Sequence, residues 1–121
     1  MVPTFDHVYF HEVCDTTCYG SELACAVIDL FIESSPVLLS ALIAAVEAQD
    51  ADRSRRLLHG IRGSASAMGG IQLTALCHAL EQSVDTVPRV EVMNRLRTIR
   101  DAHAGLVTAL REEYARLSAP H

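Results

Sequence analysis

Hydrophobic residues along most of this chain recur every three or four positions, which is the spacing of one face of an α-helix. Prolines occur only at positions 3, 36, 88 and 120, and glycines are equally sparse, so the segments between them are long. No stretch alternates polar and apolar residues in the way that a half-buried strand does. The pattern predicts an all-α protein.

Two apolar stripes are expected in the first half of the chain, after a break at Gly20 and Ser21. The first stripe consists of Leu23, Val27, Leu30 and Phe31. Ser35 and Pro36 then resemble a helix cap followed by a first-turn proline, so a new helix is expected to open there. Its stripe consists of Val37, Leu38, Leu42, Ile43 and Val46.

Three further helices are expected in the second half of the chain. Asp50 is suited to cap a helix at about residues 51–68, which should end at Gly69 and Gly70 and face inward with Leu58, Ile61, Ala65 and Met68. The next stripe consists of Leu73, Leu76, Cys77, Leu80 and Val84. Pro88 opens the longest helix, whose stripe consists of Val92, Met93, Leu96, Ile99, His103, Leu106, Leu110, Tyr114 and Leu117.

Long helices with short connections are typical of an antiparallel four-helix bundle, here preceded by one or two short N-terminal helices. We expect one domain over residues 1–121, with a helical segment at residues 1–20 and the bundle at residues 21–121. Alanine supplies 16 positions and leucine 14, and both residues favour closely packed helices.

The basic residues are ten arginines and no lysine, against fifteen acidic residues, so the net charge is -5. An acidic chain is a poor nucleic-acid binder, because phosphate contacts need a basic surface. No run of eighteen apolar residues and no secretory leader is present, so neither a membrane span nor export is expected. A cytoplasmic protein with four reduced cysteines is the interpretation that follows.

The outward face of the helix at residues 51–68 is unlike a solvated surface. Helical spacing places Arg55, His59, Arg62, Gly63 and Ser66 on that face. Gly63 costs helix stability, and its missing side chain would let a partner reach the imidazole of His59. The guanidinium of Arg62 could then neutralise an anionic group attached to a ring nitrogen. The alternative for a lone histidine is an ordinary surface residue.

The residues around His59 add a longer pattern. His59-Gly60-Ile61-Arg62-Gly63-Ser64-Ala65-Ser66-Ala67-Met68-Gly69, followed by Leu73, Cys77 and Leu80-Glu81, resembles the signature of histidine-containing phosphotransfer (HPt) domains. The resemblance extends upstream through Asp29-Leu30-Phe31, Pro36, Leu39, Leu42, Ala45 and Asp50, and so covers about residues 20–85. Two positions depart from the family pattern: Leu58 replaces a small residue, and Gly60 replaces a non-glycine.

The resemblance implies a phosphorelay intermediate without kinase activity of its own. His59 would accept a phosphoryl group from the aspartyl phosphate of one receiver domain and pass it to another, supported by Arg62, Gly63 and Ser64. The partners would be response-regulator receivers and a hybrid sensor histidine kinase. The protein would need no cofactor, since the receiver brings Mg²⁺. A monomer is expected. Arg55 and Arg56 are further candidates for anion contact.

Two alternatives of other classes stay open at this point. A bundle of this kind could dock a receiver without turnover. It could also bind metal through His7, His11, Cys14 and Cys18, which lie on one strip of a helix. Those four residues would span about 16 Å, too far to share one ion without another segment. The opposite strip, Phe5, Val8, Tyr9 and Val13, is then expected to face the bundle.

The remaining histidines and cysteines are interpreted as packing residues. His78 and His103 lie near the apolar stripes of their helices, which favours hydrogen-bonded core or boundary positions. Cys25 and Cys77 are expected to pack as small apolar side chains.

Overall fold

The computed structural model describes residues 2–14 and 16–119, with the side chains of residues 16–19 outside that description. In this part of the chain the regular structure is entirely helical. The helices are α1 (His7–Cys14), α2 (Thr16–Glu47), α3 (Ala51–Ala67), α4 (Ile71–Ser83) and α5 (Arg89–Ser118). An all-α fold is therefore confirmed.

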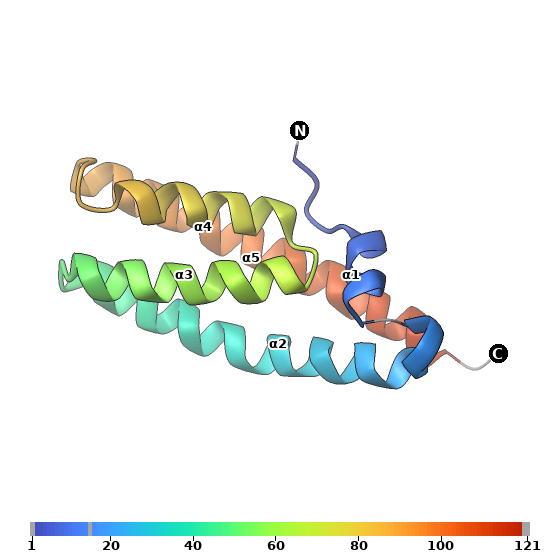
Figure 1. The fold of residues 1–121 in the computed structure, drawn as a ribbon. Coiled ribbons are helices and arrows are strands. Elements are labelled where there is room, and N and C mark those ends of the chain that lie inside the picture. Colours follow the sequence, from blue (N-terminus) through green and yellow to red (C-terminus); the bar gives the residue numbers. More distant parts are fainter. Residues whose placement is uncertain (1, 15, 120–121) are drawn as a thin grey trace.

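Helices α2 to α5 form an antiparallel four-helix bundle, and α1 crosses one of its ends (Figure 1). Helix α2 packs against α3 and α5, and α4 packs against the same two helices. The connections between consecutive helices are short, which forces each helix to run antiparallel to the one before it. The most deeply buried large side chains come from α1 to α5 alike: Phe10, Ile28, Leu42, Leu58, Ile61, Leu73, Leu80, Ile99, Leu106 and Leu110.

Both ends of α3 follow the sequence prediction. The Asp50 side chain accepts a hydrogen bond from the backbone N–H of Arg53 at 3.0 Å, so it caps the first turn. Gly69 has φ +73°, a left-handed conformation that reverses the chain after α3. Position 70 favours glycine because a Cβ there would lie 2.5 Å from Leu106 Cδ2.

The predicted break at Ser35 and Pro36 is wrong. Helix α2 runs through both residues, and its backbone leaves helical geometry at Gly20, where φ is +66°. Pro36 is exposed, so its ring lies toward solvent. Ser35 lies about 100° away around the helix, where it is buried and shares a 2.8 Å hydrogen bond with His103 Nε2.

The predicted inward stripes of α2 are also partly wrong. Leu23, Leu30 and Val37 are 41%, 63% and 68% exposed. The buried positions of α2 are Ala24, Ile28, Phe31, Ser35, Leu42, Ala45 and Val46. This helix is apolar on most of its circumference, so periodicity alone could not select the face that packs.

The apolar character of α2 also reaches the level of a membrane-spanning helix. Within Gly20–Glu47 an 18-residue window has a mean hydropathy of 1.8, so this stretch is long and apolar enough to cross a bilayer by length and composition. In the structure 28% of this window is buried, and its buried residues pack against α3 and α5.

Helix α1 faces the bundle with a different side from the predicted one. Phe10 and Cys14 are buried, whereas Val8, Tyr9 and Val13 are exposed. Phe5 packs on Phe10, with ring centroids 5.8 Å apart. Burial of the Phe10 ring removes more apolar surface from water than burial of Val8 or Val13 would, and Tyr9 carries a polar hydroxyl.

The segment before α1 is tied to the turn between α3 and α4. The Asp6 N–H donates to the Gly69 carbonyl at 2.7 Å, and the Gln72 N–H donates to the Pro3 carbonyl at 3.1 Å. On the other side of α1, His11 Nε2 lies 2.7 Å from the buried carboxylate of Glu113 in α5. These contacts fix α1 across the end of the bundle at which α3 ends.

Candidate functional site

Helix α3 places His59 and Arg62 on its outward face because Leu58, Ile61 and Ala65 are buried in the core. The imidazole of His59 is 66% exposed, whereas Arg62 is 28% exposed and lies against α4. The surface between α3 and α4 therefore carries one accessible ring and one partly enclosed guanidinium. This arrangement agrees with the face predicted from helical spacing.

One nitrogen of the His59 ring is in contact with two charged groups. Arg62 Nη2 lies 2.8 Å from His59 Nδ1, and Glu81 Oε1 lies 3.1 Å from the same atom. Within the described residues, Nε2 on the other side of the ring makes no hydrogen bond. The ring is thus held through Nδ1, and Nε2 is left for a partner.

Arg62 connects three side chains of this surface. Besides its contact with His59, its Nη1 donates to His78 Nδ1 at 3.0 Å. Its Nε lies 3.2 Å from Glu81 Oε2. That last pair is an ion pair rather than an aligned hydrogen bond, since no donor among the described residues is directed at this buried oxygen. The guanidinium fork accordingly bridges two imidazoles and one carboxylate.

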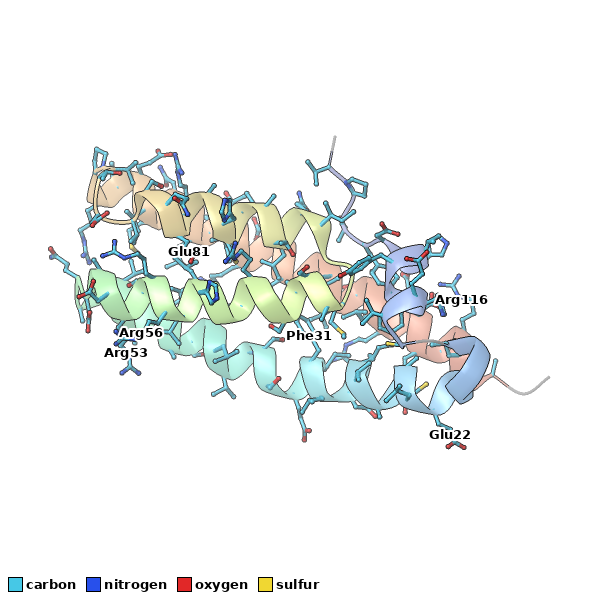
Figure 2. All side chains as sticks on the ribbon, viewed as in Figure 1. Glu22, Phe31, Arg53, Arg56, Glu81 and Arg116 are labelled. Atoms are coloured by element: carbon cyan, nitrogen blue, oxygen red, sulfur yellow. The ribbon has the colours of Figure 1, made fainter. Side chains whose placement is uncertain are left out.

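Sequence reasoning did not name Glu81 and His78 as site residues. Both project from α4, which faces α3 across this surface, and Glu81 is labelled there in Figure 2. Glu81 appeared only as the last residue of the Leu80-Glu81 pair in the HPt-like pattern. His78, which was expected at a core or boundary position, is exposed and hydrogen-bonded to Arg62. His78 lies one turn before Glu81 and therefore on the same face of α4, and this spacing was the signal that could have placed it at the site.

Gly63 and Ser64 differ in how they relate to the ring. A Cβ added at Gly63 would have no heavy atom within 4 Å, so the space beside His59 is open. Ser64 Oγ donates to the Ile61 carbonyl at 3.1 Å, a bond within its own helix. Gly63 therefore provides clearance, and Ser64 contacts the α3 backbone rather than the imidazole.

Among the described residues, no contact joins His59 to Arg55 or Arg56, the other two arginines considered for anion contact. Arg55 pairs with Asp52 and with Asp85, each at 2.9 Å. The Arg55 guanidinium lowers the pKa of the Asp85 carboxyl through its hydrogen bond. Arg53 and Arg56 extend from the end of α3 that lies next to α2 (Figure 2). Of the basic residues of α3, Arg62 is the one that contacts His59.

An open groove adjoins the site on the side of Arg62 and His78. It has a volume of about 550 Å³, and its other walls include Tyr9, Ser66, Ile71 and Thr74. Tyr9 and Ile71 are partly exposed there, 42% and 38% respectively. The surface next to the reactive ring is consequently concave and mostly apolar.

The residues of the N-terminal strip that were considered as metal ligands have different surroundings in the structure. His11 is bonded to Glu113, Cys14 is buried, and the side chain of Cys18 lies outside the described residues. No group of three or more His, Cys, Asp or Glu side chains among the described residues is placed to hold an ion. Nothing in this arrangement favours the metal-binding alternative.

Of the cysteines described in the structure, Cys14 and Cys77 are buried in the core, whereas Cys25 is only partly buried. Cys14, Cys25 and Cys77 are free thiols. Burial and, to a smaller extent, the nearby Glu81 carboxylate raise the pKa of the Cys77 thiol to about 12, so it stays protonated.

Comparison with known proteins identifies the family of this chain. The profile of the Hpt domain matches residues 26–120, which is most of the chain. The chain belongs to the Hpt domain family. A search of curated protein sequences returned no match.

Two solved structures have the same fold as this Hpt domain. The crystal structure of histidine-containing phosphotransfer protein B (HptB) from Pseudomonas aeruginosa PAO1 is 23% identical, with a TM-score of 0.83 over 94% of this chain and 96% of that one. The HPT domain of the Hpt sensor hybrid histidine kinase from Shewanella is 17% identical, with a TM-score of 0.73 over 96% and 97%. At these identities the likeness concerns the fold, and the roles of individual residues must be argued from the site.

Proposed function

We propose that this Hpt domain carries a phosphoryl group on Nε2 of His59, between the aspartyl phosphate of one receiver domain and the aspartate of another. One observation carries the proposal: the ring is two-thirds exposed and is held through Nδ1 by Arg62 and Glu81, so that Nε2 faces outward. A ring held in this way is oriented before its partner arrives.

Transfer to His59 is a displacement at phosphorus. The lone pair of Nε2 forms the N–P bond while the bond from phosphorus to the aspartyl oxygen breaks, and the aspartate carboxylate leaves with that electron pair. Transfer to the second receiver reverses these steps. Phosphoryl transfer depends more on positioning and charge neutralisation than on covalent work by the protein. Arg62 supplies the positive charge and Gly63 the access.

Glu81 has a role that follows from the charge on the ring. When neutral His59 with a proton on Nδ1 bonds to phosphorus, the ring becomes an imidazolium. A carboxylate 3.1 Å from Nδ1 accepts that N–H and stabilises the positive ring. Glu81 thus contributes to orientation and to charge balance, without giving up or taking a proton in the transfer.

The Mg²⁺ ion and the acidic pocket for this reaction belong to the receiver in our proposal, so the Hpt domain itself needs no cofactor and has no kinase activity. Its partners are response-regulator receivers and a hybrid sensor histidine kinase, and it acts in the cytoplasm. Support for these statements comes from the family membership and from the open surface around His59.

The direct test is transfer of labelled phosphate from a phosphorylated receiver. Wild-type protein should acquire label that is lost in acid and kept in base, and His59→Gln should acquire none. His7→Gln is the matched control, since it replaces an exposed histidine of α1 and should leave labelling unchanged. If wild type binds phosphorylated receivers tightly but stays unlabelled, the domain docks without turnover and the proposal fails.

A further inference from the structure

The two groups at His59 Nδ1 need opposite protonation states of that atom. Arg62 Nη2, at 2.8 Å, can only donate, so it needs a lone pair on Nδ1. The Glu81 carboxylate, with Oε1 at 3.1 Å, can only accept, so it needs a proton on Nδ1. A neutral imidazole satisfies one of them at a time. The resting site therefore holds a competition between two tautomers of His59.

The two tautomers differ in reactivity at Nε2. When Nδ1 accepts from Arg62, the ring proton is on Nε2, and this nitrogen has no lone pair with which to attack phosphorus. When Nδ1–H donates to Glu81, the lone pair is on Nε2 and faces outward. Of the two contacts, the one with Arg62 is shorter. The shorter contact is thus the one that the unreactive tautomer satisfies.

His78 secures Arg62 in this resting position. Its Nδ1 accepts a 3.0 Å hydrogen bond from Arg62 Nη1, the other arm of the fork that touches His59. Without that acceptor, the guanidinium would be free to rotate toward Glu81 Oε2, a buried oxygen that has no aligned donor. The charged groups around His78 come from three elements. Arg62 of α3 faces it, Glu81 follows it by one turn on α4, and Asp6 lines the same groove.

From these contacts we infer that His78 is a positioning residue that, through Arg62, keeps unphosphorylated His59 in the tautomer with a proton on Nε2. An incoming phosphoryl group attracts Arg62 away from Nδ1. Solvent water then takes the proton from Nε2 and donates a proton to Nδ1, where Glu81 accepts the N–H, so the ring stays neutral and no net proton is gained or lost. The site in this way becomes nucleophilic only when a phosphoryl group is present. This inference rests on the proposed function.

The test uses a matched pair of substitutions at position 78. His78→Asn keeps an acceptor oxygen near the position of Nδ1, whereas His78→Leu removes the acceptor and retains a side chain of similar bulk. Nitrogen-15 NMR of the full, unphosphorylated chain at pH 8 reads the tautomer of His59 directly. Wild type and His78→Asn should show a protonated Nε2, and His78→Leu should shift toward a protonated Nδ1. The same tautomer in all three proteins would overturn the inference.

A rate measurement completes the test. If only a fraction of wild-type His59 is in the reactive tautomer, His78→Leu should accept phosphate from a receiver about two- to tenfold faster, and His78→Asn at the wild-type rate. A slower His78→Leu protein with unchanged melting temperature would contradict the inference. The NMR result requires no receiver, so it can hold while transfer fails, and that combination would reject the proposed function alone.

Discussion

His59 and His103 are both held by hydrogen bonds on helices of the same bundle, yet their surroundings differ in almost every respect. His59 is largely exposed and is bonded through Nδ1 to charged groups. His103 is half-buried, bonds through Nε2 to Ser35, and lies 6.0 Å from the Phe31 ring. A helical histidine becomes a candidate phosphoacceptor when the bonded nitrogen is the inner one and the outer nitrogen is left accessible.

The largest expected effect comes from removing the charge beside His59. Arg62→Ala should slow phosphoryl transfer about 10- to 100-fold, since a hydrogen bond to a charged group contributes about 1.5–3 kcal/mol. Arg62→Ala should also release His59 from the unreactive tautomer, which would speed transfer. The loss of positive charge beside the phosphoryl group should outweigh this gain, because the phosphoryl charge is present in every transfer. Single-turnover transfer from a labelled receiver measures the rate. Arg62→Lys should be intermediate, and the exposed Arg97→Ala on α5 should match wild type.

On the buried side, Gly70→Ala should lower the free energy of unfolding by about 1–3 kcal/mol, as expected for overpacking. The added Cβ would lie 2.5 Å from Leu106 Cδ2 and 3.1 Å from the Ala65 carbonyl oxygen. Urea denaturation measures the change. Gly105→Ala is the control, because its Cβ would have only an ordinary 3.5 Å contact with Thr4. Equal stability of the two variants would show that this side of the bundle is less tightly packed than the structure indicates.

A substitution on the exposed face should have the opposite sign. Gly63→Ala should raise the free energy of unfolding by about 0.5–1 kcal/mol, since its Cβ has open space and alanine favours a helix. It should slow transfer from a receiver but not from acetyl phosphate, which needs less room. Gly60→Ala has equally open space but lies about 100° from His59 around the helix, so it should gain stability and keep its transfer rate.

The smallest effect concerns the pH dependence at His103. Burial lowers the pKa of this histidine below its usual value of 6.5, so the unfolded chain takes up a proton at a higher pH than the folded one. Stability should therefore fall as the pH decreases through 6.5, with a slope of at most about 1.4 kcal/mol per pH unit from this group. His103→Gln should reduce that slope in urea titrations between pH 5 and 7.5. An unchanged slope would mean that the ring is protonated equally easily in both states.

Helix α3 could be predicted in detail because its sequence is strongly two-sided. Its inward residues Leu58, Ile61 and Ala65 are separated from a face that is charged or glycine, and Asp50 and Gly69 mark its ends. The placement of His59 beside Arg62 followed from that pattern. The roles of His59, Arg62, Gly63 and Ser64 remain predictions that the experiments above address.

Helix α2 resisted the same reasoning because it is apolar on most sides. Leu23, Leu30 and Val37 recur at seven-residue intervals, as buried residues would, but they are exposed. The packed face includes Ser35 instead, whose hydroxyl is bonded to His103. A polar residue that is buried through a partner on another helix has no periodic signature in the sequence.

The contributions of α4 to the site were hidden for a related reason. Whether Glu81 and His78 reach His59 depends on how α4 is rotated against α3, and that rotation is set by the packing of Leu73, Cys77 and Leu80. Sequence spacing orders residues around one helix but does not relate two helices to each other.

The left-handed glycine that ends α3 has a consequence for genetics. Any other residue at position 69 would need φ +73° and would press its Cβ against the Asp6 carbonyl that crosses this turn. In a selection for relay function, loss-of-function alleles should therefore arise at codon 69 as well as at codon 59. The two classes would differ in dosage: alleles at codon 69 should be rescued by overexpression or lower temperature, and alleles at codon 59 by neither.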